Sequence, residues 1–218
     1  MKTAIFPARK FNYLSFCCLL LLITLCGNAQ VSYDACKVID YIKASNTGAG
    51  DGFGTVVALS ADGLTLAAGA PYELGNGTGI NPGDNNLATN AGAVYIYTRS
   101  DLQAPWSFQA YIKASNTGSG DFFGGAIALS PDGNTLAVGA YSESGSGTGI
   151  NPGDDNLATG AGAVYIYTRS GSTWSFQAYI KASNTEAFDH FGVSVALSAD
   201  GNTLAAGAFF ESGSGTGI

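Results

Sequence analysis

The chain repeats itself, and this internal repetition constrains its fold more than any other feature. The word Tyr-Ile-Lys-Ala-Ser-Asn-Thr occurs at residues 41–47, 111–117 and 179–185, at spacings of 70 and 68 residues. Three further words follow each copy in the same order: a Phe-Gly pair, the turn sequence Ala-Leu-Ser-x-Asp-Gly, and Gly-Thr-Gly-Ile. Such repeats are supersecondary units that bury a core only against their neighbours. We therefore predict repeats at 41–110 and 111–178 and a truncated third repeat at 179–218.

Each full repeat contains four strand-like runs. In the second copy they span residues 125–130, 135–141, 163–169 and 174–182, and the last alternates in polarity as a strand does. Pro131 and Gly133 supply the dihedral angles of a tight turn between the first two runs. Four antiparallel strands a repeat predict an all-β fold, a β-propeller of four-stranded antiparallel blades with about two and a half blades present and essentially no helix. A β-solenoid or a row of small sandwiches is the alternative.

Three motifs give the repeat a family resemblance. They are Phe53-Gly54, then Gly69-Ala70-Pro71, and then Gly-Ala-Val-Tyr-Ile-Tyr at residues 92–97. This order resembles the FG-GAP repeat of integrin α-chain propellers and of many exported bacterial proteins, from residue 41 to the C-terminus. Tyr141 and Phe209 replace the proline in the later copies. The resemblance implies a seven-bladed propeller with roles in cell adhesion and extracellular recognition.

The first 29 residues are typical of a signal peptide. Lys2, Arg9 and Lys10 precede an apolar stretch at residues 13–26, and a small-residue cleavage site ends at Ala29. The apolar stretch is short for a membrane span, which needs about 20 residues. An uncleaved anchor and a lipoprotein acylated at Cys26 are the alternatives. We expect a secreted or cell-surface protein without a membrane span after cleavage.

Charge and cysteine content describe the exported part. Beyond Gln30 the chain keeps six of nine Lys and Arg and all sixteen Asp and Glu, so the net charge falls from −7 to −10. Such an acidic protein is unsuited to nucleic acid or anionic lipid. Cys36 is the single cysteine beyond the signal peptide, so packing rather than an internal disulfide must hold the fold.

Residues 30–40 are a candidate closure strand. The segment aligns with the fourth strand of a blade and places Cys36 where Trp106 and Trp174 stand in the full repeats. Two and a half blades would leave unpaired sheet edges. We therefore expect a fragment of a longer protein, or an assembly, in which the remaining blades or other copies cover these edges.

The long loop between the second and third strands is the candidate cation site. Calcium takes 6–8 oxygen ligands, and this loop offers several in each full copy: Asn81, Asp84, Asn86, Asn151, Asp154, Asp155 and Asn156. The alternative is a surface loop whose Asn and Asp side chains cap their own backbone. The turns at Asp62, Asp132 and Asp200 have too few oxygens for calcium, so we predict plain turns there.

No catalytic constellation is visible in the sequence. The single histidine, His190, is not repeated in the other copies, and no nucleophile elbow, zinc helix or phosphate loop is present. Asp51, Asp121 and Asp189 precede each Phe-Gly pair, and their recurrence favours a structural role. The sequence predicts a non-enzymatic binding scaffold whose rim loops, residues 71–92 and 141–162, recognise an extracellular protein or glycan. A propeller domain of a larger secreted hydrolase and a purely structural surface protein are the alternatives.

Overall fold

The computed structural model describes residues 40–213. The predicted signal peptide and all but the last residue of the candidate closure strand lie outside this range. The described residues form antiparallel sheets and contain no helix. No helix within this range is therefore long and apolar enough to cross a membrane. The all-β prediction is confirmed.

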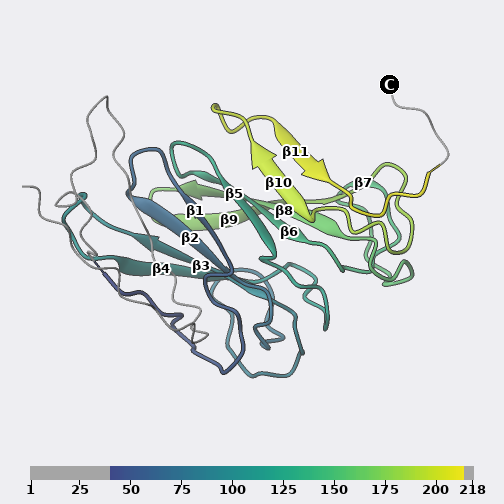
Figure 1. Ribbon diagram of the computed structural model, residues 1–218, viewed down its shortest axis with the longest axis horizontal. Coiled ribbons are helices and arrows are strands. Elements are labelled where there is room, and N and C mark those ends of the chain that lie inside the picture. Colours follow the sequence, from purple (N-terminus) through teal and green to yellow (C-terminus); the bar gives the residue numbers. More distant parts are fainter. Residues whose placement is uncertain (1–39, 214–218) are drawn as a thin grey trace, which may run out of the picture. The chain divides into compact units, whose positions relative to one another are not determined.

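Each full repeat forms one antiparallel sheet (Figure 1). The first sheet has the order β1-β2-β3-β4 and the second the order β5-β6-β8-β9-β7, while the third repeat contributes the hairpin β10-β11. The strands are β1 Val56–Leu59, β2 Thr65–Ala70, β3 Ala93–Thr98, β4 Ser107–Ile112, β5 Ala126–Leu129, β6 Thr135–Ala140, β7 Gly149–Ile150, β8 Ala163–Ser170, β9 Thr173–Lys181, β10 Ser194–Leu197 and β11 Leu204–Gly207. Four consecutive antiparallel strands with short hairpins are the unit of a propeller blade.

The turn between the first two strands is closed by its own side chains. Ser60 Oγ donates to Asp62 Oδ1 at 2.6 Å, and Asp62 Oδ1 accepts the Leu64 amide at 2.9 Å. Gly63 supplies the positive φ of 69° that the turn needs. The second and third repeats place Asp132 and Asp200 in the same contacts. Each carboxylate is thus used by its own turn, and the absence of calcium from these turns stays a prediction.

The glycines of the recurring motifs let neighbouring repeats meet backbone to backbone. A Cβ added to Gly69 in the first repeat would lie 2.2 Å from the carbonyl oxygen of Gly124, the glycine of the second Phe-Gly pair. A Cβ added to Gly139 would lie 1.9 Å from the carbonyl oxygen of Gly192 in the next repeat. No side chain fits there. The repeated glycines therefore fix how closely one sheet packs on the next.

The phenylalanine of each of the first two Phe-Gly pairs packs into the sheet of its own repeat. Phe123 is fully buried and meets the rings of Tyr165 and Tyr167 edge to face, at 5.3 and 6.2 Å between centroids. Phe53 repeats the arrangement against Tyr95 and Tyr97. Such edge-to-face aromatic pairs add about 0.5–1.5 kcal/mol each beyond burial.

Asp51, Asp121 and Asp189 stabilise the turn that leads into the first strand of each repeat. Their carboxylates accept the backbone amides of Gly48, Gly118 and Glu186 at 2.7, 2.6 and 2.9 Å. All three side chains are buried. The structural role predicted from their recurrence is confirmed.

Candidate functional site

The two rim loops, residues 71–92 and 141–162, leave the sheet after its second strand and return to the third. Each loop also pairs with the outer edge of the fourth strand, at Ile80–Ile112 in the first repeat and through β7–β9 in the second. The loop therefore folds back over its own blade. Long loops without secondary structure of their own are uncommon unless functional, and these two are held firmly.

A buried ion pair anchors each rim loop at its base. Glu73 lies just after β2, and its Oε2 is 2.5 Å from Nζ of Lys113, which follows β4. Glu143 and Lys181 form the same pair at 2.6 Å in the second repeat. The side chains of both pairs are almost completely inaccessible to solvent. Burial lowers the pKa of Lys113, and the contact with Glu73 opposes this shift.

Tyrosine and asparagine side chains surround the ion pair. In the second repeat the Tyr179 hydroxyl donates to Glu143 Oε1 at 2.9 Å, and Asn116 Nδ2 donates to the same oxygen at 3.2 Å. The Tyr165 hydroxyl donates to Asn116 Oδ1 at 2.6 Å. The network therefore satisfies the polar groups that the loop base removes from water.

The first repeat builds the same network with one difference. Asn46 contacts Glu73 and accepts the Tyr95 hydroxyl at 2.5 Å, but the buried Tyr111 hydroxyl has no hydrogen-bond partner among the described residues. Burial and the nearby Glu73 carboxylate raise the pKa of Tyr111. We infer that Tyr111 stays neutral and faces the carboxylate without a well-aligned bond.

Two of the predicted cation ligands are used to dock the loop on the fourth strand. Asn81 Oδ1 accepts the Tyr111 amide at 2.9 Å, and Asn151 Oδ1 accepts the Tyr179 amide at 2.8 Å. Both asparagines have a positive φ, near 50°, which asparagine tolerates better than most residues. These side-chain oxygens thus serve the loop backbone.

The remaining predicted ligands lie along the loop tip. Asp84 Oδ2 accepts from Asn46 Nδ2 at 3.0 Å, and Asp155 accepts both the amide and the hydroxyl of Ser146, at 2.9 and 2.6 Å. These bonds with Ser146 lower the pKa of Asp155. Asn86 and Asn156 both have a positive φ of 52°.

The hydrogen bonds of the predicted ligands do not point to a common position for a cation. Within residues 40–213, no group of three or more His, Cys, Asp and Glu side chains is arranged to hold a metal ion. Calcium also takes asparagine and backbone carbonyl oxygens, which both loops contain. Calcium binding at the rim loops therefore stays a prediction.

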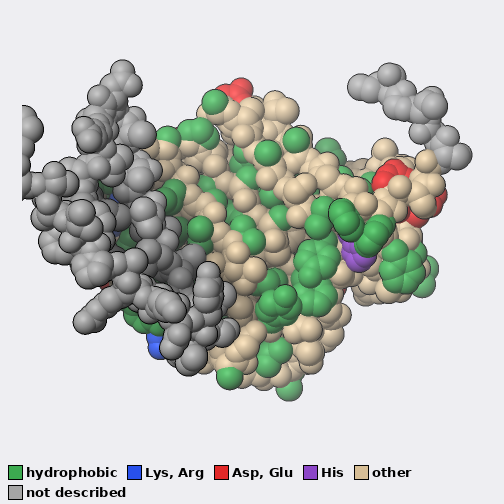
Figure 2. All heavy atoms as spheres, viewed as in Figure 1, with side chains coloured by type: hydrophobic (Ala, Val, Ile, Leu, Met, Phe, Trp, Pro, Cys, Tyr) green, Lys and Arg blue, Asp and Glu red, His purple; other side chains and the backbone are tan. Residues whose placement is uncertain are grey.

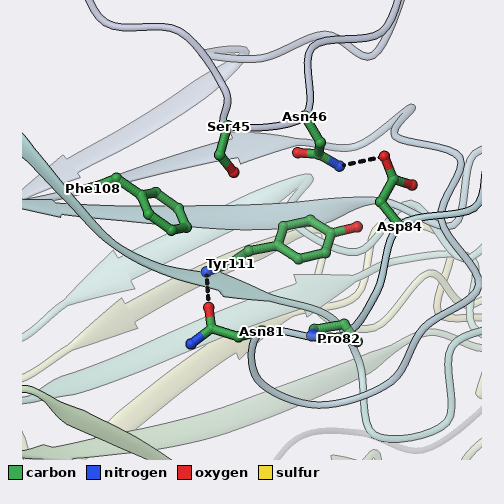
Figure 3. A pocket seen from close by; sticks show the side chains of 7 residues that line it. All are labelled: Ser45, Asn46, Asn81, Pro82, Asp84, Phe108 and Tyr111. Atoms are coloured by element: carbon green, nitrogen blue, oxygen red, sulfur yellow. Dashed lines mark hydrogen bonds between the residues drawn. The ribbon is translucent and has the colours of Figure 1, made fainter.

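A pocket opens beside the first rim loop (Figure 3). It has a volume of ≈ 270 Å³ and is lined by Ser45, Asn46, Asn81, Pro82, Asp84, Phe108 and Tyr111. In the close-up the rings of Phe108 and Tyr111 lie along one side, and Asn46 reaches across to Asp84. Aromatic surface with a few converging polar groups is the usual make-up of a small-ligand site. We call this the rim pocket.

The rim pocket combines predicted and unpredicted residues. Asn81 and Asp84 were singled out in the sequence, whereas Phe108, Tyr111 and Asn46 were not. All seven lining residue types recur in the second repeat, as Ser115, Asn116, Asn151, Pro152, Asp154, Phe176 and Tyr179. The repeated word that begins at Tyr41 was thus itself the signal, because it supplies the tyrosine, the lysine and the asparagine of this region.

The antiparallel sheets of four and five strands, which approach one another closely at glycines, define a β-propeller-type repeat protein. A family model for the FG-GAP repeat matches residues 106–167 and 174–217. The chain is an FG-GAP repeat protein, as its motifs predicted. A comparison with curated proteins gave no match. FG-GAP repeats are typical of extracellular, propeller-type binding domains.

Proposed function

We propose that this chain is a non-catalytic extracellular recognition module that binds its ligand at the rim loops. The observation that carries the proposal is the buried Glu–Lys pair at the base of each loop. It holds a long, exposed loop in one conformation before any ligand arrives. Preorganisation of this kind lowers the ordering cost of binding.

The rim pocket is the contact point we propose in the first repeat. Phe108 presents a half-exposed ring, and Asp84, Asn46 and Ser45 offer polar atoms beside it. An aromatic surface edged by hydrogen-bonding groups suits a polar ligand with an apolar face, such as part of a glycan or an exposed peptide side chain. The adhesive role implied by the family is one use of such a site.

Binding to arrays of extracellular proteins and glycans tests the proposal. We expect the wild-type protein to retain a ligand, and we expect Phe108→Ala and Asp84→Ala each to weaken that binding about tenfold or more, as the loss of an interface anchor does. Ser172→Ala is the matched control, because Ser172 is exposed in the β8–β9 turn outside both rim loops. The proposal fails if no ligand is retained, or if the pocket variants bind as the control does.

A further inference from the structure

A continuous row of aromatic rings crosses the three repeats, and two of its rings, Tyr72 and Tyr141, come from the starts of the two rim loops. We call it the aromatic ladder: Tyr72, Phe122, Tyr141, His190 and Phe210. Successive ring centroids lie 5.8, 5.1, 5.9 and 5.6 Å apart. Tyr72 is 42% and Phe210 60% exposed, and the three rings between them are half-buried. Figure 2 shows hydrophobic side chains gathered beside the single histidine on this face.

Two rungs of the ladder are held in a backbone conformation that costs energy. Phe122 and His190 both have a φ of 55°, in the left-handed region that few non-glycine residues adopt, histidine more often than phenylalanine. The first repeat has Gly52 at the equivalent position, with a φ of 70°. The same turn hydrogen bond forms in all three copies, from Thr55, Gly125 and Val193. The fold therefore does not need a ring at this position.

A strained residue that the fold does not require points to function. The two rings are not buried in the core, and glycine makes the same turn without strain. Each ring adds instead to an exposed aromatic surface. His190 is also fixed in place, since its Nδ1 lies 2.9 Å from the carbonyl oxygen of Tyr141. The ladder is thus a surface of fixed aromatic rings that packing of the fold does not require.

The surroundings of the ladder narrow the class of ligand. Stacked aromatic rings bind nucleic-acid bases when a positively charged groove follows the backbone, but this chain has a net charge of −7. Of the acidic residues next to the ladder in sequence, Glu73, Asp121 and Asp189 are buried, and Glu211 beside Phe210 is exposed. The ladder therefore offers ring faces, tyrosine hydroxyls and an imidazole, with one exposed carboxylate at its end. This combination suits a neutral ligand with apolar faces and hydroxyl edges.

The repetition of the contacts indicates a ligand that itself repeats. The pairs Tyr72–Phe122 and Tyr141–His190 each join one repeat to the next, at 5.8 and 5.9 Å with steeply inclined rings. A row of similar contacts suits a polymer of similar units. A folded protein partner would need a broader patch, about 800 Å² on each side.

We propose that the aromatic ladder binds a neutral polysaccharide, whose sugar rings pack on the aromatic faces. This inference rests on the proposed binding function and adds a second contact surface to the rim pocket. The rim pocket recognises a short polar group, whereas the ladder holds a stretch of chain. Packing of sugar rings on the aromatic faces, with hydrogen bonds to the tyrosine hydroxyls and the imidazole, is sufficient for this binding.

Native gels that contain a soluble neutral polysaccharide test the ladder. The full chain is acidic and migrates toward the anode, and xylan, a mixed-linkage β-glucan and galactomannan serve as probes in separate gels. We expect at least one of them to retard the wild-type protein. Phe122→Gly and His190→Gly should each reduce this retardation about tenfold, as the loss of an aromatic anchor does. Both variants introduce the residue that the first repeat already uses.

Controls separate the ladder from the rim pocket and from loss of fold. Leu102→Ala removes another exposed apolar side chain outside both surfaces and should leave retardation unchanged. The glycine variants should unfold within a few degrees of wild type, because relief of strain offsets the lost ring contacts. A much lower thermal unfolding midpoint in the glycine variants would show that the rings stabilise the fold, and would overturn the inference.

Two further results would overturn the ladder as a polysaccharide site. If none of the three polysaccharides retards the protein, the ladder does not bind them, and the rim pocket is still judged by its own array experiment. If Phe108→Ala abolishes retardation while Phe122→Gly does not, the polysaccharide binds in the rim pocket. A loss of self-association in Phe122→Gly, measured by light scattering without polysaccharide binding, would show that a second copy covers the ladder.

Discussion

Asp121 shows what a single recurring residue does in this fold. Its carboxylate is buried and accepts the Gly118 amide at 2.6 Å. Burial raises its pKa to about 6, and Glu143 and Asp154 add to the rise, whereas the Gly118 bond and Lys113 oppose it. The ordinary value is 3.8. The charged form is therefore the unfavourable one in the folded protein.

The direction of this shift fixes how stability depends on pH. Between about pH 4 and pH 6 the folded state holds more protons on Asp121 than the unfolded state, so the free energy of unfolding falls as the pH rises. Relative to Asp121→Asn, we expect the wild type to lose on the order of 3 kcal/mol across this range, from a shift of about two pKa units. Urea unfolding of both proteins at several pH values measures the difference.

Asp132→Asn is the control for this prediction. The Ser130 hydroxyl lowers the pKa of Asp132, the opposite direction to the shift of Asp121. This variant should therefore keep the loss of stability between about pH 4 and pH 6 that Asp121→Asn removes. If the difference in the free energy of unfolding between the wild type and Asp121→Asn stays constant with pH, the raised pKa of Asp121 is contradicted.

At the scale of the strands, the buried pair of Glu73 and Lys113 joins β2 to β4 through the loop base. Replacing one partner leaves an uncompensated buried charge, which costs about 3–5 kcal/mol. We therefore expect Lys113→Met to lower the free energy of unfolding by that amount. Equilibrium unfolding in urea, followed by circular dichroism, measures it.

The double variant Glu73→Gln with Lys113→Met is the test of mechanism. Removing both charges removes the unpaired one, so this protein should recover most of the lost stability. If the double variant is no more stable than Lys113→Met, the loss comes from packing of the lysine side chain rather than from its charge.

The sequence predicts these strands well because their pattern is local. The run expected at residues 174–182 is β9, Thr173–Lys181, and the run expected at 135–141 is β6, Thr135–Ala140. The sequence does not predict features that depend on pairing between strands. A register shift between Ile166 and Tyr167 interrupts the pairing of β8 with β9, and β7 forms only because β9 offers a free edge.

The candidate site could be predicted only in part for the same reason. The rim loops and Asp84 are visible as a polar, glycine-rich stretch. The rim pocket and the ion pair are not, because Glu73 and Lys113 lie 40 residues apart and meet only when the blade forms. The aromatic ladder could not be predicted from the sequence either. Its rings come from three repeats, and they follow no periodic spacing within a strand.

At the scale of the whole molecule, residues 41–44 repeat the sequence that ends β4 and β9. The Tyr97 hydroxyl donates to the Lys43 carbonyl at 2.6 Å, as the Tyr167 hydroxyl donates to that of Lys113 at 2.8 Å. Yet Tyr41 is 77% exposed, whereas Tyr111 is buried. The segment thus packs on the blade that follows it through Ile42 and Ala44, while the Tyr41 ring is exposed.

We predict that residues 41–44 act as the fourth strand of another blade, formed by further repeats or by a second copy. Pairing of this kind would cover an otherwise open edge and bury Lys43 as Lys113 is buried. Hydrogen exchange of the protein secreted by its native host measures it, because paired amides exchange slowly. Protection of residues 41–44 should match that of residues 111–114, with the loop tip at residues 83–86 as the fast-exchanging reference. Exchange of residues 41–44 as fast as this tip would show that the segment stays unpaired and would contradict the prediction.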